Sequence, residues 1–215
     1  MNYYPIHLDI TDRSCIVVGG GDVAERKVQR LLECGGHVIV IAKALTPALE
    51  TMTKEGRIHW IDDIYSEAYI RNAFLVIGAT DRTEINAKIS ADARKSGVMV
   101  NIVDDPEKCD FILPSVFQRG DLSIAVSTGG KSPALAKKLR EDMENLYGPE
   151  YKTLLAILGK LRQKVKDKGQ SYNENKRLFE AVVNSDILQF IREKNWNRVN
   201  KMIRDMTGED IEAEE

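Results

Sequence analysis

The feature that most constrains the fold of this chain is a short apolar run that leads into a glycine cluster and then into a helical pattern. Residues 16–18 are Ile, Val and Val, a β-branched run suited to a central strand covered on both faces. Residues 19–21 are all glycine, and beyond them Val28, Leu31 and Leu32 recur at helical spacing. The sequence therefore predicts a strand, a tight turn and a helix in immediate succession.

The same alternation of strands and helices continues to about residue 113. Gly35-Gly36 ends the first helix, a second helix is expected to begin at Thr46-Pro47, and a third is expected over residues 83–96, before Gly97. Further strands are expected at residues 38–41, 57–61, 73–78 and 98–103. Five strands that alternate with helices predict an α/β fold with a parallel, doubly wound Rossmann sheet.

The glycine cluster has the spacing of a loop that binds the pyrophosphate of a dinucleotide. Gly19 permits the tight turn, Gly21 lets the backbone approach the phosphates, and Ala24 is the third small residue, where the helix packs closely on the strand. The helix that begins near Asp22 presents unpaired N–H groups and its positive dipole end to the anion. Three clustered glycines also fit an ordinary turn, but the complete β-α-β unit favours the dinucleotide site.

The pattern changes at Pro114. Two short strands around residues 119–121 predict a hairpin, and Ser132 is placed to cap a helix that runs from Pro133 to about residue 147. From residue 149 onward the pattern is helical only. We therefore predict three parts, a dinucleotide-binding domain over residues 1–113, a hairpin-and-helix segment over 114–148 and an all-α domain over 149–215.

Composition narrows the class of protein. A formal net charge of −2 gives no general attraction to nucleic acid, and no apolar run approaches the roughly 20 residues that span a bilayer. The N-terminus lacks the pattern of a signal peptide, so we expect a cytoplasmic protein without membrane or nucleic-acid partners. Its three cysteines and three histidines are scattered, so no metal site is predicted and buried free thiols are expected.

The second half of the chain carries an uneven charge. Residues 151–206 hold 13 Lys and Arg against 6 Asp and Glu, and the last seven residues hold five acids. Two interpretations of the basic excess stay open, a solvated helical surface and a surface that binds a polyanionic ligand.

Chemistry in an open parallel sheet is expected at the carboxyl ends of its strands. Residues 19–22, 42–44, 79–81 and 104–105 follow four of the predicted strands. Lys43, Ala44 and Thr80 are therefore candidate cofactor-binding residues. Asp104 is the candidate acid or base, because a carboxylate at this edge faces both cofactor and substrate, although Asp105-Pro106 also fits a plain turn.

A polar loop precedes the helix that begins at Pro133. Ser127 and Thr128 lie beside Gly129 and Gly130. Hydroxyl and backbone N–H groups in such a loop bind carboxylates, or they serve only to cap the helix. Both interpretations stay open at this point.

Five motifs resemble one family, the siroheme-synthase N-terminal type of precorrin-2 dehydrogenases, with or without sirohydrochlorin ferrochelatase activity. The resemblance extends over nearly the whole chain and is strongest to about residue 145. The motifs are Val18-Gly-Gly-Gly-Asp-Val-Ala-Glu-Arg-Lys27, Ala79-Thr-Asp81, Asn101-Ile-Val-Asp104, Phe111-Ile-Leu-Pro-Ser115 and Ala125-Val-Ser-Thr-Gly-Gly-Lys-Ser-Pro-Ala134.

The resemblance implies an enzyme with NAD as its cofactor. The NAD loop would comprise Gly19, Gly21, Asp22 and Val23, and Asp104 would be the residue on which dehydrogenation depends. It also implies a homodimer built from residues 114–147. Thr128 departs from a serine that is linked to regulation in a relative, so regulation there is not expected. The resemblance does not extend to the methyltransferase domain that some relatives carry, so this chain is not expected to make its own precorrin-2.

The implied substrate is precorrin-2 and the product is sirohydrochlorin, with Fe²⁺ as the substrate of a secondary ferrochelatase activity. A tetrapyrrole with acetate and propionate groups is a polyanion, so Ser127, Thr128, Gly129 and the cations Arg119, Lys131, Lys137 and Lys138 are the expected substrate-binding residues. The alternatives are a non-catalytic NAD-binding redox sensor and a dehydrogenase of another small metabolite. NAD is expected over NADP, although Lys43 stands where NAD-specific proteins often have an acidic residue.

Overall fold

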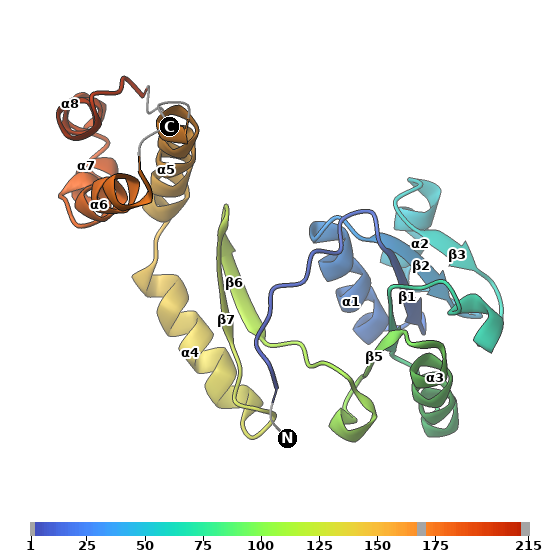
Figure 1. Cartoon of the computed structure of the whole chain (residues 1–215). Coiled ribbons are helices and arrows are strands. Elements are labelled where there is room, and N and C mark those ends of the chain that lie inside the picture. Colours follow the sequence, from blue (N-terminus) through green and yellow to red (C-terminus); the bar gives the residue numbers. More distant parts are fainter. Residues whose placement is uncertain (1–2, 167–170, 212–215) are drawn as a thin grey trace. The chain divides into compact units, whose positions relative to one another are not determined.

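The structure is a computed structural model that describes residues 3–166 and 171–211. It divides into two compact units, residues 1–113 and residues 114–215. Figure 1 shows the strands and helices of both units. No helix in the described residues is long and apolar enough to cross a membrane.

The first unit contains a five-stranded sheet in which every neighbouring pair is parallel. Its strands are β1 (Ser14–Val18), β2 (His37–Ile41), β3 (His59–Ile61), β4 (Leu75–Gly78) and β5 (Met99–Ile102), in the spatial order β3-β2-β1-β4-β5. The predicted parallel sheet is therefore confirmed. Strands β3 and β4 begin two residues later than predicted, because the N–H groups of Arg57 and Ala73 close turns on the carbonyls of Met52 and Ile70.

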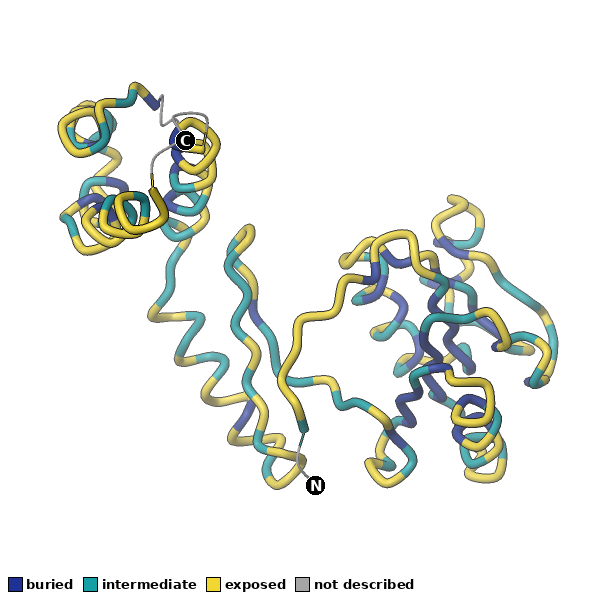
Figure 2. Tube along the Cα trace, viewed as in Figure 1, coloured by how far each residue is buried: buried dark blue, intermediate teal, exposed yellow. Residues whose placement is uncertain are grey.

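Helices cover both faces of this sheet. Alternate residues of a strand point to opposite faces, so Cys15 and Val17 of β1 pack in one buried cluster and Ile16 and Val18 in another. The first cluster includes side chains of α1 (Asp22–Glu33) and α2 (Pro47–Lys54), and the second includes side chains of α3 (Thr83–Ser96). Figure 2 shows the buried residues concentrated between these layers.

The cysteines correct one expectation. Cys15 and Cys109 are buried as predicted, but Cys34 is exposed. Cys34 follows the last residue of α1, and its N–H closes the helix on the carbonyl of Leu31, so its side chain lies beyond the apolar stripe of the helix. Burial raises the pKa of the Cys15 thiol to about 11, which keeps this group neutral.

The second unit begins with the predicted hairpin, β6 (Ser115–Arg119) and β7 (Leu122–Val126), which pair antiparallel. Gly120, in the turn, has φ +58°, a conformation that glycine adopts at little cost. Helix α4 (Pro133–Leu146) follows and packs on both strands. The predicted cap is present, because the Ser132 hydroxyl accepts a hydrogen bond from the N–H of Leu135 at 3.2 Å.

The remaining described residues form helices around a core of their own. These helices are α5 (Glu150–Lys166), α6 (Tyr172–Val183), α7 (Ile187–Arg192) and α8 (Trp196–Thr207). Leu161, Ile187, Val199 and Ile203 are fully buried in one cluster. The predicted all-α character of this region is confirmed for the part of the chain that the structure describes.

Candidate functional site

The sheet order places the candidate site at the carboxyl ends of its strands. The chain runs outward from β1 in one direction to β2 and β3 and in the other to β4 and β5, so strand order reverses between β1 and β4. Ligands of such sheets bind at this reversal. A cleft of about 720 Å³ opens there and is lined by Val18, Gly19, Gly20, Gly21, Asp22, Val23, Ile41, Ala42, Lys43, Ala44, Asp63, Ile64, Tyr65, Ala79, Thr80, Asp81, Arg82, Ile85, Val103 and Asp104.

The three consecutive glycines meet different constraints. Gly19 has φ +122°, and a Cβ built there would lie 2.3 Å from the carbonyl oxygen of Ala79. A Cβ on Gly20 would lie 1.9 Å from the carbonyl oxygen of Ala44. A Cβ on Gly21 would meet nothing within 4 Å. Gly19 and Gly20 are therefore required by the fold, whereas Gly21 leaves its backbone open to the cleft.

Backbone hydrogen bonds hold the glycine loop in place. The N–H of Gly19 donates to the carbonyl of Ile41 at 3.0 Å, and the carbonyl of Gly20 accepts from the N–H of Thr46 at 2.9 Å. On the other side of β1, the N–H of Ala79 donates to Val18 at 2.8 Å. The loop is thus fastened to the segments after β2 and β4, and its shape is set before any ligand binds.

The N-terminus of α1 is prepared for an anion. Gly21 is the N-cap residue and supplies no side-chain cap to the first turn of this helix. In contrast, Thr46 caps α2 and Ser132 caps α4 through their hydroxyl groups. Uncapped N–H groups at a helix N-terminus, with the positive end of the helix dipole, form a phosphate site. The open backbone at Gly21 and the uncapped turn together fit a dinucleotide pyrophosphate.

The charged side chains of the cleft also indicate that backbone N–H groups bind the pyrophosphate. The charged residues among its lining are Asp22, Asp63, Asp81, Asp104, Lys43 and Arg82. Four carboxylates against two cations give the cleft an acidic balance, so side-chain charge alone does not attract a diphosphate. The N–H groups of the glycine loop and of α1 must supply most of the attraction.

Most of the predicted cofactor residues line this cleft. Gly19, Gly21, Asp22, Val23, Lys43, Ala44 and Thr80 are all among them. Ala24 is fully buried in the cluster between α1 and the sheet, which agrees with its expected packing position. The Thr80 hydroxyl donates to Asn86 Oδ1 at 2.8 Å and accepts from the N–H of Arg82 at 3.2 Å, so it orders the loop after β4.

Asp104 lies at the edge of the cleft on a constrained backbone. It is exposed and has φ +61°, in the left-handed region that Asn and Asp enter more readily than other residues with side chains. The Cys109 thiol holds the loop behind it, because Sγ accepts from the N–H of Ile102 at 3.1 Å and lies 3.2 Å from the carbonyl of Asp105. The loop therefore fixes the direction in which Asp104 leaves the sheet.

Two further titratable groups border this region. Burial, together with the charge of Arg26, lowers the pKa of Lys27 on α1, and the negative charge of Asp104 opposes that shift. Burial also raises the pKa of Tyr65, as does the adjacent Asp92 carboxylate, to which the Tyr65 hydroxyl donates at 3.1 Å. Tyr65 therefore presents a neutral ring to the cleft.

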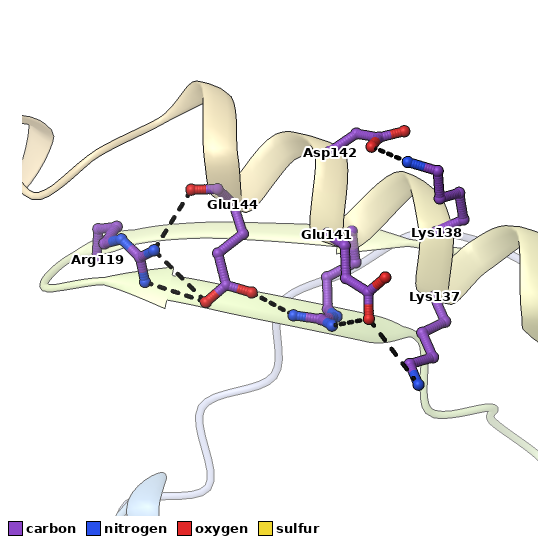
Figure 3. Close-up of polar contacts among 7 residues, drawn as sticks. Arg119, Lys137, Lys138, Glu141, Asp142 and Glu144 are labelled. Atoms are coloured by element: carbon purple, nitrogen blue, oxygen red, sulfur yellow. Dashed lines mark hydrogen bonds and ion pairs between the residues drawn. The ribbon is translucent and has the colours of Figure 1, made fainter.

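The predicted substrate residues belong to the second unit. Arg119 contacts Glu144 at 3.4 Å, and Lys137 lies 3.9 Å from Glu141 (Figure 3). Lys138, shown in the same figure, is paired with Asp142.

The polar loop before α4 is largely occupied with its own hydrogen bonds. Ser127 Oγ accepts from the N–H of Gly129 at 3.2 Å, and Thr128 Oγ1 accepts from the N–H of Ser132 at 3.1 Å. Lys131 is exposed. Every described residue that lines the cleft belongs to the first unit, so the structure leaves the predicted cofactor and substrate residues in separate groups.

Sequence reasoning missed three parts of the cleft. One is Gly20, where an added Cβ would lie closest to the backbone of a neighbouring loop. Another is residues 63–65, which follow β3, and the third is Arg82 and Ile85 at the start of α3. The signal for the second was present, because Asp62 and Asp63 come directly after a predicted parallel strand and the carboxyl ends of such strands share one edge.

Comparisons with known proteins decide the family. The profile of a family described as putative NAD(P)-binding matches residues 6–115, more than half of the chain, and that of the sirohaem biosynthesis protein central family matches residues 119–146. The chain belongs to the NAD(P)-binding family. The resemblance to the siroheme-synthase N-terminal type is confirmed, and the first unit is an NAD(P)-binding domain.

Individual relatives agree with this assignment. The chain is 39% identical to siroheme synthase 1 of Serratia proteamaculans over 182 residues, which are 85% of this chain and 38% of that protein. It is 37% identical to the siroheme synthase of Actinobacillus succinogenes over 94% of this chain and 42% of that protein. The chain therefore spans about two fifths of the length of these relatives.

A solved structure shares the fold. The structure of SirC, a precorrin-2 dehydrogenase, superposes with a TM-score of 0.74 and covers 93% of this chain and 100% of its own, at 23% identity. The succession of parallel sheet, hairpin and C-terminal helices is thus a known architecture.

Proposed function

We propose that this protein is an NAD-dependent dehydrogenase that oxidises precorrin-2 to sirohydrochlorin in siroheme biosynthesis. The observation that carries the proposal is the cleft at the strand-order reversal, where an open glycine loop and an uncapped helix N-terminus lie on the same cleft as Asp104. Similarity to siroheme synthases over 85–94% of the chain supports the choice of substrate. We also propose that this NAD-dependent enzyme acts in the cytoplasm.

Each part of the cleft has a distinct task in this reaction. NAD, when bound, supplies the acceptor for the hydride that leaves the reduced tetrapyrrole. The N–H groups at the start of α1 would hold the pyrophosphate of NAD, and the residues after β2 and β3 that line the cleft would hold its adenosine end. Asp104 accepts or relays the proton that precorrin-2 loses together with the hydride.

The cleft is lined by more carboxylates than cations, so the carboxylates of the tetrapyrrole require further cations. We assign this task to Arg119, Lys131 and Lys137, with the hydroxyl and N–H groups of Ser127, Thr128 and Gly129. The side chain of Lys137 is 72% exposed, and an exposed ion pair such as the one with Glu141 contributes only about 0–1 kcal/mol. A substrate carboxylate therefore replaces Glu141 at little cost.

The test is a turnover assay with precorrin-2. Anaerobic incubation with NAD⁺ should produce sirohydrochlorin and NADH together, and both are followed by absorbance. NAD binding without turnover of precorrin-2 would instead indicate a redox sensor or a dehydrogenase of another metabolite. Binding of sirohydrochlorin, seen as a change in its visible spectrum, separates the proposed function from a dehydrogenase of another small metabolite, which predicts no tight tetrapyrrole binding.

We also propose that the protein is a two-fold homodimer built from residues 114–147. The hairpin and α4 contribute only two buried apolar side chains, Phe117 and Ala136, whereas Leu135, Leu139 and Leu146 are exposed. These leucines share one face of α4 because their spacings are four and seven residues. A self-complementary pairing of this face would bury all three in each copy.

The dimer prediction is checked by analytical ultracentrifugation at micromolar concentration. The wild type should sediment as a dimer, and the double variant Leu135→Glu, Leu139→Glu should sediment as a folded monomer. The matched control is Lys137→Glu, which alters the charge on another side of the same helix and should leave the dimer intact. A monomeric wild type would contradict the prediction.

Ferrochelatase activity is proposed as a weak secondary function at the same cleft. No group of three or more His, Cys, Asp or Glu side chains in the described residues is arranged to hold a metal ion. Insertion of Fe²⁺ as a substrate also needs a base for the pyrrole protons, and we assign this role to Asp104, the carboxylate already assigned the proton of the dehydrogenation.

We expect slow metal insertion that depends on Asp104. The measurement supplies sirohydrochlorin with Fe²⁺ or Co²⁺ under anaerobic conditions to the wild type and to Asp104→Asn. A wild-type rate equal to that without protein would restrict the enzyme to dehydrogenation. An undiminished rate in the variant would place metal insertion at another site.

A further inference from the structure

The segment that follows β2 bears on the choice between NAD and NADP. NAD-specific proteins often place an acidic residue there to accept a hydrogen bond from the ribose 2′-hydroxyl, but this chain has Lys43. A cation at that position would favour the 2′-phosphate of NADP. The charge of Lys43 is, however, already engaged, because its Nζ lies 2.9 Å from Asp62 Oδ1 and 3.3 Å from the Asp62 carbonyl oxygen.

The segment after β3 lies against the segment after β2. Ile41 and Ile61 are partners in the parallel ladder, and the N–H of Ala42 donates to the carbonyl of Ile61 at 3.3 Å. The residues that follow both strands therefore reach the same part of the cleft. Lys43 and Asp63 are both among the residues that line it.

The Asp63 carboxylate is held in place and charged. One oxygen accepts a hydrogen bond from the Tyr69 hydroxyl at 2.5 Å, and the other accepts from the N–H of Ile64 at 2.7 Å. These two hydrogen bonds lower the pKa of Asp63, and the positive charge of Lys43 adds to the effect. Each carboxylate oxygen retains a further lone pair for a ligand.

We propose that Asp63 is the residue that makes this site select NAD over NADP. The proposal rests on dinucleotide binding in the proposed function and identifies the determinant of cofactor choice. The carboxylate accepts a hydrogen bond from the 2′-hydroxyl of NAD and repels the 2′-phosphate of NADP, because like charges at close range disfavour binding. With Lys43 matched by Asp62, Asp63 leaves this end of the cleft with a net negative charge.

The experiment measures the dissociation constants of NAD⁺ and NADP⁺ by titration calorimetry, without tetrapyrrole. We expect the wild type to bind NAD⁺ at least about 30-fold more tightly than NADP⁺. Asp63→Asn keeps the shape and an acceptor for Tyr69 but removes the charge, so the preference should fall by about 10-fold or more. Should that variant fail to fold, Asp63→Ser removes the same charge and serves in its place.

Asp62→Asn is the matched control, since it removes the neighbouring charge and releases Lys43. It should change the preference by no more than about 3-fold, because Lys43 is exposed and screened by solvent. A larger shift in Asp62→Asn than in Asp63→Asn would make Lys43 the determinant and overturn the proposal. Equal binding of NAD⁺ and NADP⁺ by the wild type would also overturn it.

The outcomes for cofactor choice and for the reaction are separable. NAD⁺ selectivity that depends on Asp63, without turnover of precorrin-2, would support this inference and contradict the proposed function. Turnover with equal use of both dinucleotides would do the reverse.

Discussion

Replacing Asp104 by Asn should lower kcat for oxidation of precorrin-2 by about 10²–10⁴-fold, the usual contribution of a positioned acid or base. The substitution removes the charge while keeping nearly the same volume. Asn also tolerates the left-handed φ of +61° at this position, so the backbone should not change. Single-turnover absorbance measurements with saturating NAD⁺ give the rate directly.

The interpretation of that variant depends on binding and stability measured in parallel. NAD⁺ affinity and the thermal unfolding temperature should remain close to the wild-type values. Asp105→Asn is the matched control, because this neighbouring carboxylate does not line the cleft and is paired with Lys108. Near-normal turnover of Asp104→Asn would show that Asp104 only shapes the turn and that another group takes the proton.

Replacing Gly21 by Val should weaken NAD⁺ binding by about 100-fold or more while the protein stays folded. The side chain would project into the space through which the backbone approaches the pyrophosphate, and each lost hydrogen bond to a charged group is worth about 1.5–3 kcal/mol. A Cβ at Gly21 meets no atom within 4 Å, so the folded state itself is not disturbed by that atom. Titration calorimetry provides the affinity.

Gly20→Ala is the contrasting variant in the same loop. Its new methyl group would lie 1.9 Å from the carbonyl oxygen of Ala44, so the loops after β1 and β2 would have to separate. We expect a loss of about 2 kcal/mol or more in the free energy of unfolding.

Unchanged NAD⁺ affinity in a folded Gly21→Val protein would contradict the placement of the pyrophosphate.

The local pattern of the sequence was sufficient for most elements of the fold. Residues 16–18 are β-branched and fully apolar, which is the composition of a strand buried on both faces, and that strand is the centre of the sheet. Ser132-Pro133 predicts the start of α4 because both the hydroxyl cap and the fixed φ of proline act within one turn. Such signals depend only on neighbours along the chain.

The position of Asp104 was also predictable, because any residue directly after a parallel strand lies at the ligand edge of the sheet. Its left-handed backbone and the thiol contacts of Cys109 were not, since they arise from the path of the loop after β5. Likewise, the ion pair of Arg119 with Glu144 depends on how α4 packs on the hairpin. The pair of Lys137 with Glu141, in contrast, joins residues four apart on one helix and is a local feature.

The sequence by itself determined the class of site in this protein. That site has a glycine loop between a buried strand and a helix, and a carboxylate after the fifth strand of the parallel sheet. Only the tertiary structure decided what surrounds that loop. Gly20 is constrained by Ala44, more than 20 residues further along the chain, and Asp63 reaches the cleft because β3 pairs with β2 in a particular register. The physical reason is that strand order and register set these distances, and neither is encoded in any one local segment.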